Sequence, residues 1–113
     1  MNKLINGWTK EKLIEKIETD FKGKSVGEDG RTCLYRGKQG TKCAVGLFIP
    51  DELYSLKMEH RSVNSLLNEF DLLKTYMPLY NDSMDNLQFI HDNSSKGNCK
   101  QEMIDWVNNY VTN

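Results

Sequence analysis

The chain is organised around residues 33–54, CLYRGKQGTKCAVGLFIPDELY, where the helical patterning of the flanking sequence is interrupted. This stretch holds two of the three cysteines and three of the eight glycines. Residues 33–36 and 41–45 are short runs that contain Leu, Tyr, Thr and Val, and the segment 37–40 between them begins and ends with glycine. The pattern predicts a β-hairpin with its turn at 37–40.

The predicted hairpin brings two thiols close together. With the turn at 37–40, Arg36 faces Thr41 and Leu34 faces Cys43. A shift of one residue in the length of the turn places Cys33 opposite Cys43 instead. In either register, the two cysteines are expected to be neighbours.

Helical signals lie on both sides of this stretch. Thr9 is a typical N-cap residue, and the apolar residues that follow it recur at helical spacing until Gly23, which is a natural stop. Ser62 has the same capping role for a second long helix, which we expect to continue until just before Pro78. Both helices should turn one apolar face toward a common core.

The remaining signals complete a small α+β fold. Pro50 and the two acids after it predict one turn of helix. A third helix is predicted at 83–91, and the spacing of Asn98 and Gln101 resembles a capping box that begins a fourth. We therefore predict a single domain spanning 1–113, in which a β-hairpin is packed by about four helices.

Composition limits the classes of function. The 113 residues suit one core, and the formal net charge of -1 makes nucleic acid an unexpected partner, because phosphate-backbone binders usually carry a basic excess. The sequence contains no apolar run of bilayer length and no apolar segment of a secretory signal, so a cytoplasmic protein without a membrane partner is expected. Three cysteines in such a chain are expected to be free thiols.

A metal site is one alternative for the cysteines. Cys33, Cys43 and His91 are soft ligands, and Cys99 or His60 could join them. However, no pair of them has the short spacing of a zinc knuckle, so we predict no cofactor and keep structural zinc as an alternative. The simpler interpretation is that the hairpin cysteines are small buried hydrophobic residues.

A cysteine-dependent hydrolase or transferase is a second alternative. Cys43, His91 and Asp92 supply a nucleophile, a base and an orienting acid. Asp92 directly follows His91, and a carboxylate reaches the ring of its own neighbour only awkwardly. We instead expect His91 to accept or donate a hydrogen bond at a helix end, to a carbonyl or to the acids at 51–52.

Binding is the third possibility. Arg36, Lys38 and Lys42, together with the ring of Tyr35, provide the groups that hold phosphates, nucleotides or acidic protein surfaces. The same cations could instead pair with nearby acids in a structural network. The residues predicted to bind a ligand or partner are Tyr35, Arg36, Lys42, Asp51, Glu52, Tyr54, His91 and Asp92.

A longer motif adds a resemblance. Cys33-x-Tyr-Arg-Gly-x-x-Gly-x-Lys-Cys-Ala-Val-Gly46, then Ile49-Pro-Asp-Glu-x-Tyr54, with Leu87-Gln-x-x-His-Asp92 and Trp106, resembles a family of small uncharacterised proteins of bacteriophages and prophages. Phe48 departs conservatively from the leucine of that pattern. The resemblance implies a fold and a phage setting but brings no established activity.

Together these observations favour a non-enzymatic accessory protein of phage type. We expect it to act by binding a host or defence protein, which makes it an anti-defence candidate, or a small nucleotide-like ligand. If it is encoded by a phage, its place is the cytoplasm of the host cell. The oligomeric state is not indicated by the sequence.

Overall fold

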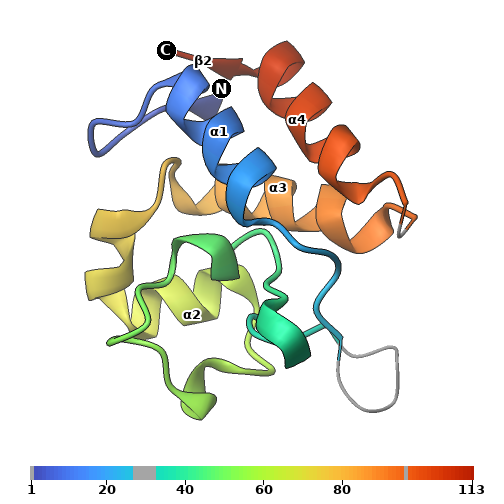
Figure 1. Ribbon diagram of the computed structural model, residues 1–113. Coiled ribbons are helices and arrows are strands. Elements are labelled where there is room, and N and C mark those ends of the chain that lie inside the picture. Colours follow the sequence, from blue (N-terminus) through green and yellow to red (C-terminus); the bar gives the residue numbers. More distant parts are fainter. Residues whose placement is uncertain (1, 27–32, 96) are drawn as a thin grey trace.

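The computed structural model describes residues 2–26, 33–95 and 97–113. Within these ranges the α-helices and strands are β1 (Asn2–Lys3), α1 (Lys10–Asp20), α2 (Val63–Glu69), α3 (Asn81–Asn93), α4 (Cys99–Tyr110) and β2 (Val111–Thr112). Figure 1 shows α1 and α4 side by side, with α3 crossing beneath them and α2 on the far side of α3. The mixture of helices with a small sheet agrees with the α+β class.

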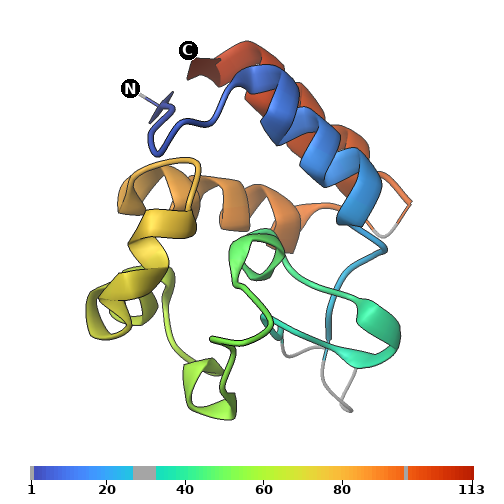
Figure 2. The same ribbon diagram turned by 60° about the vertical axis from the view of Figure 1, so that its left-hand side comes forward.

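The sheet joins the two ends of the described chain. β1 and β2 are parallel, with Asn2 paired to Val111 and Lys3 paired to Thr112. The next amide, Leu4 N, donates to Thr112 O at 3.2 Å. Figures 1 and 2 both place the N- and C-termini close together at this sheet. The sequence analysis did not predict these strands.

The first helix begins where the sequence predicts. Thr9 Oγ1 accepts the Lys12 amide at 3.2 Å, so this cap satisfies one of the free amides of the first turn. Leu13 and Ile17 are fully buried on the inward face of α1. The helix ends at Asp20, three residues before Gly23, because Phe21 takes an extended conformation and packs into the core.

The second helix also begins as predicted but is shorter. Ser62 Oγ accepts the Ser65 amide at 3.2 Å. α2 ends at Glu69, and after Phe70 the chain continues as a 3₁₀ helix over Asp71–Tyr76. Because 3₁₀ spacing keeps a similar periodicity, the apolar residue Leu73 is still buried. The prediction of one helix until Pro78 was therefore wrong.

The last two helices follow the predicted order with different ends. α3 is longer than the predicted 83–91 and buries Met84 and Leu87. α4 follows Asn98, but the Asn98 side chain caps no amide, and the Gln101 amide donates to Asp105 Oδ1 at 2.8 Å. The predicted capping box is therefore absent from this pair of residues.

The central stretch is not a β-hairpin. The chain reverses, but Arg36 and Lys42 form a single isolated antiparallel bridge instead of two strands. Cys43 N donates to Tyr35 O at 3.3 Å, so Tyr35 stands opposite Cys43, and neither predicted register is correct. The reason is that the chain bends immediately after Cys43: Leu47 N donates back to Cys43 O at 3.1 Å, and Gly46–Phe48 forms a 3₁₀ turn.

The turn after Pro50 is smaller than a helix. Leu53 N and Tyr54 N both donate to Pro50 O, at 3.0 and 3.1 Å. This is the single turn that the proline and the acids predicted, although no helix forms. A 3₁₀ turn at Leu56–Met58 follows, and it leads to the start of α2.

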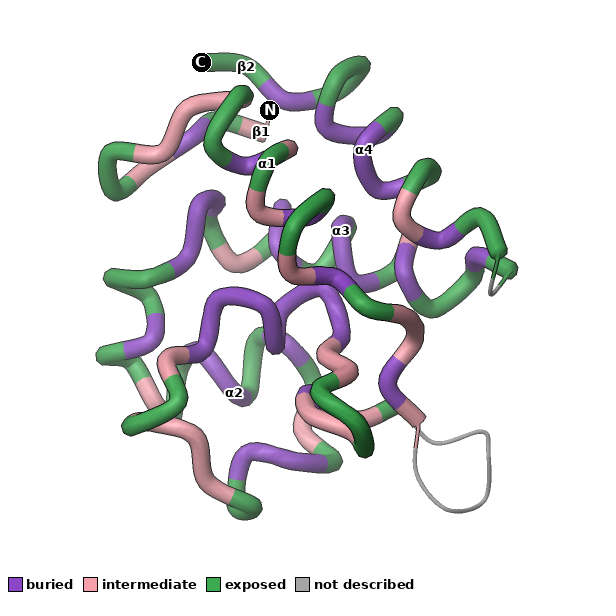
Figure 3. Tube along the Cα trace, viewed as in Figure 1, coloured by how far each residue is buried: buried purple, intermediate pink, exposed green. Residues whose placement is uncertain are grey.

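The buried apolar side chains form one cluster. It includes residues of α1, α2, α3 and α4 and also Cys43, Ala44 and Val45 of the central stretch. Figure 3 shows buried segments running through the middle of the molecule, with exposed residues on the outer turns of the helices. In the described part of the chain, no helix is long and apolar enough to cross a membrane.

Gly46 should be the most sensitive glycine of the central stretch. A Cβ atom at Gly46 would lie 1.9 Å from Tyr35 O, which is backbone and cannot move away alone. We predict that Gly46→Ala lowers the free energy of unfolding by about 3 kcal/mol or more. The control is Gly97→Ala, whose Cβ would meet nothing within 4 Å, and which should change stability by less than about 1 kcal/mol. Urea denaturation followed by circular dichroism measures both, and equal stability of the two variants would contradict the prediction.

Candidate functional site

A buried carboxylate holds the central stretch together. Glu59 is 9% exposed, and its Oε1 accepts the Tyr35 amide at 2.8 Å. Its Oε2 accepts the Arg36 amide at 3.2 Å and the Tyr54 hydroxyl at 2.5 Å. Three donors thus replace the water that the carboxylate loses on burial.

Arg36 is engaged on the other side of this carboxylate. Its Nη2 atom donates to Ile49 O at 2.6 Å and lies 2.7 Å from Asp51 Oδ1. The guanidinium carbon lies 4.8 Å from the centroid of the Tyr54 ring, in a cation–π position. The Arg36 side chain is only 18% exposed, so its guanidinium group mainly contacts other protein groups and little of it can reach a ligand.

Tyrosine side chains close the network. The Tyr35 hydroxyl donates to Arg61 O at 2.6 Å, and Tyr35 is buried. Burial, and next the hydrogen bond to Glu59, raises the pKa of Tyr54 to about 12. Tyr35, Arg36, Asp51 and Tyr54, which were predicted to bind a ligand, therefore form a structural network around Glu59.

Glu59 itself was not predicted as part of the site. It stands in the polar segment between Met58 and His60, which carries no recognised motif. The neighbouring His60 has a positive φ of 62°, which bends the chain after Glu59. Two of its three partners, Tyr35 and Arg36, lie more than twenty residues earlier, and no pattern in the sequence marks such a carboxylate, so only the structure reveals its role.

A second polar cluster lies on α3. His91 is fully buried, and its Nδ1 lies 2.9 Å from Asp92 Oδ1. Gln88 Nε2 donates to the same Oδ1 at 2.8 Å, and Gln88 Oε1 accepts the Val45 amide at 3.1 Å. The expectation that Asp92 reaches its neighbour's ring only awkwardly was wrong, and the acids at 51–52 are engaged elsewhere or exposed.

The pKa of Asp92 reflects these contacts. Burial alone would raise it, but hydrogen bonds from His91, Gln88 and Cys33 outweigh burial and hold the pKa below the ordinary value of an aspartate. Asp92 is therefore a carboxylate at neutral pH.

All three cysteines are free. Cys43 is 1% exposed, burial raises its pKa far above the ordinary value, and its Sγ accepts the Gly46 amide at 3.2 Å. Cys33 is exposed, and its pKa is also raised, by partial burial and then by the hydrogen bond to Asp92. Burial raises the pKa of Cys99 to about 11. Raised pKa values keep thiols protonated and therefore weakly nucleophilic.

The alternative residue sets are arranged as follows. The predicted catalytic set was Cys43, His91 and Asp92; the structure joins His91 to Asp92, whereas the Cys43 thiol accepts the Gly46 amide. For metal binding, no group of three or more His, Cys, Asp or Glu residues within 2–26, 33–95 and 97–113 is placed to hold an ion. Cys33, Cys43 and His91 thus form no such group.

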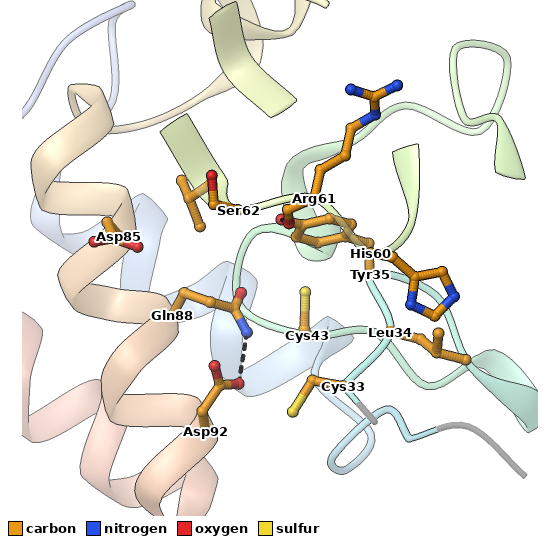
Figure 4. A pocket seen from close by; sticks show the side chains of 11 residues that line it. Cys33, Leu34, Tyr35, Cys43, His60, Arg61, Ser62, Asp85, Gln88 and Asp92 are labelled. Carbon is orange, nitrogen blue, oxygen red and sulfur yellow. Dashed lines mark hydrogen bonds between the residues drawn. The ribbon is translucent and has the colours of Figure 1, made fainter. Parts of the chain in front are cut away.

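Cys33 and Asp92 border a small cavity of about 170 Å³. Figure 4 shows Gln88 and Asp92 of α3 on one side of it and Cys33, Cys43 and Tyr35 of the central stretch on the other. His60, Arg61 and Ser62 form its rim. Of the eight predicted binding residues, two line this cavity, Tyr35 and Asp92. The other six do not: Lys42 and Asp51 line another hollow, Glu52 is exposed, and Arg36, Tyr54 and His91 are not part of the lining.

Comparison of the chain with models of protein families, with curated proteins and with solved structures found no match. The geometry described above is therefore the basis for assigning a role.

Removal of the Glu59 charge should weaken the fold. We predict that Glu59→Gln lowers the free energy of unfolding by about 2–3 kcal/mol. The substitution replaces one carboxylate oxygen, which accepts hydrogen bonds, with an NH₂ group, which can only donate them. Glu52→Gln is the control, since Glu52 is exposed, and a change below about 0.5 kcal/mol is expected. Thermal and urea denaturation measure both variants; a Glu59→Gln protein as stable as the control would show that the carboxylate is dispensable.

Asp92 should make stability depend on pH. Because its pKa is lower in the folded protein, its contribution is complete above the ordinary aspartate pKa of about 3.9 and is lost as pH falls through the folded value. We predict that Asp92→Asn costs about 1.5–3 kcal/mol at pH 7, and that the difference from the wild type shrinks below about pH 4. Urea denaturation between pH 7 and pH 3 measures this difference, and Asp85→Asn, an exposed residue of α3, is the control. A difference that is constant over the whole range would contradict the prediction.

Proposed function

We propose that the protein is a non-enzymatic accessory protein of bacteriophage type that acts by binding, either to a host or defence protein or to a small nucleotide-like ligand. The phage setting rests on the motif that begins at Cys33 and ends at Trp106. The binding role rests on the burial of Cys43 and His91, which disfavours catalysis by this pair, and on the side chains that are exposed to a partner.

The observation that supports this role most strongly is the burial of Cys43 and His91. A cysteine nucleophile must reach its substrate as a thiolate, with a base beside it. Cys43 and His91 are both within the core, and the Cys43 pKa is raised by burial. His91 Nδ1 is engaged by Asp92. Covalent catalysis by Cys43 would require both residues to leave these positions.

The surface offers places for a partner. Large apolar or aromatic side chains are exposed on the turns and outer helix faces, and such groups supply much of the contact energy in complexes. They are Leu56, Leu72, Tyr76, Tyr80, Phe89 and Tyr110. Lys42, which belongs to the predicted binding set, is only half-buried and lies outside the Glu59 network.

The test compares two buried cysteines. Tagged wild-type protein is purified from bacterial host cells, and mass spectrometry identifies proteins and small molecules that remain bound. We predict that folded Cys43→Ser retains the bound molecule with affinity within about threefold of the wild type, because Cys43 is not a nucleophile. Cys99→Ser is the matched control, because it also replaces a buried thiol with a hydroxyl but at a position outside the predicted catalytic set.

Two outcomes would contradict the proposal. A wild-type preparation that retains neither protein nor small molecule argues against a binding role. Loss of function in a folded Cys43→Ser protein, with Cys99→Ser unaffected, would instead favour the hydrolase or transferase that uses Cys43 and His91.

A further inference from the structure

A second hollow, larger than the cavity beside Cys33, opens next to Lys42. Its volume is about 310 Å³. It lies where Trp8, which precedes α1, and Lys16 of α1 meet Lys42, the segment 47–51 and Tyr76 at the end of the 3₁₀ helix Asp71–Tyr76. The residues that line this Lys42 hollow are Trp8, Lys16, Lys42, Leu47, Phe48, Ile49, Pro50, Asp51 and Tyr76.

The apolar wall of the Lys42 hollow is rigid. Its residues are buried in the core, where close packing restricts side-chain movement: Leu47 is 3% exposed, Phe48 5% and Ile49 2%. The Trp8 ring meets the Phe48 ring edge-on, with centroids 5.3 Å apart. Trp8 is therefore held in place although it is only half-buried.

Aromatic surface is available to a ligand in this hollow. Tyr76 is 43% exposed, and Trp8 is partly exposed beside the buried wall. Flat rings of this kind stack on planar ligands, and the interaction tolerates different bases or rings. An aliphatic or purely ionic ligand would leave this surface unused.

The charge of the Lys42 hollow is positive overall. Its lining residues include two lysines, Lys16 and Lys42, and one acid, Asp51. The Asp51 carboxylate is compensated by Arg36 at 2.7 Å. Lys16 also contacts Asp20 at 2.5 Å; this half-exposed pair at helical spacing contributes little to stability, so Lys16 can also contact a ligand. The remaining charge favours an anion.

We propose that the Lys42 hollow binds a small anion that carries an aromatic ring, of the size and chemistry of a nucleoside monophosphate. In this arrangement the ring lies against Trp8 and Tyr76, and the lysine ammonium groups face the anion. The inference rests on the proposed binding function and selects, from its two kinds of partner, the small ligand.

The size of the hollow narrows the ligand further. Sites for small molecules usually have volumes of about 300–1,000 Å³, and the Lys42 hollow is at the lower end. One ring system with one anionic group suits this volume better than a dinucleotide. The cavity beside Cys33 is a poorer candidate, because it measures about 170 Å³ and is lined by the carboxyl groups of Asp85 and Asp92.

Isothermal titration calorimetry with defined probes tests the inference. The wild-type protein is titrated with AMP, GMP, CMP, UMP, adenosine and inorganic phosphate. At least one monophosphate should bind at least about tenfold more tightly than adenosine and than phosphate, because only it engages both the rings and the lysines. Added salt should weaken this binding but leave that of adenosine unchanged.

Single substitutions locate the site. Lys42→Gln should weaken binding of the monophosphate about tenfold, and Tyr76→Leu should weaken it about fivefold or more by removing a stacking surface. Lys57→Gln removes an exposed lysine that does not line the hollow and should change affinity less than about twofold. Denaturation curves confirm that each variant is folded.

The outcomes separate this inference from the proposed function. No binding of any monophosphate at millimolar concentration overturns the inference, whereas a host protein retained on purification would leave the binding function standing. The inference is also overturned if inorganic phosphate binds as tightly as the monophosphates. It is likewise overturned if Lys42→Gln and Lys57→Gln weaken monophosphate binding by the same factor. A monophosphate that binds but is unaffected by Lys42→Gln and Tyr76→Leu would place the ligand elsewhere.

Discussion

The central stretch of the structure depends on the Glu59 carboxylate, which accepts three hydrogen bonds from it. Between Cys33 and Ser62 the chain has turns and isolated bridges but no helix or strand long enough to satisfy its own backbone. Glu59 supplies the missing acceptors for the amides of Tyr35 and Arg36 and ties them to Tyr54. Burying a carboxylate is costly, and it is tolerated here because charge-assisted donors surround it.

This constraint decides which residues remain available to a partner. Arg36 is drawn toward Ile49 and Asp51, and Gly46 is pressed against the carbonyl of Tyr35. The chain can bend so sharply after Cys43 only because residue 46 has no side chain. As a result, the conspicuous cation of the motif is structural, and Lys42, on the outer side of the bend, borders open space.

The sequence predicted local structure well where one residue decides it. Thr9 and Ser62 cap their helices because their hydroxyls meet amides three residues ahead. The hairpin, the length of α2 and the role of Asn98 were predicted wrongly. Asn98 fails as a cap for a local reason, because its side-chain amide donates to Ser95 Oγ at 3.1 Å. The turn-rich segment 37–40 fits a hairpin locally, but the packing of Ala44, Val45 and Leu47 into the core favours a bend over a second strand. The terminal strands are two residues each and pair across nearly the whole chain, so no periodic pattern could reveal them.

In the candidate site too, the sequence predicted residues that are close in the chain better than residues that meet only in the fold. Of the eight residues predicted to bind a ligand or partner, four that are close in sequence lie together in the structure: Tyr35, Arg36, Asp51 and Tyr54. Lys42, Glu52, His91 and Asp92 lie outside this group. The sequence did not indicate that these residues surround the Glu59 carboxylate. Their polar groups are used in hydrogen bonds and an ion pair within the protein and are not free to bind a ligand. The Lys42 hollow is assembled from Trp8, Lys16, Lys42 and Tyr76, which come from separate segments and meet only after the core has formed. A surface built in this way leaves no motif in the sequence, because its residues are dispersed along the chain and the spacing between them follows no period.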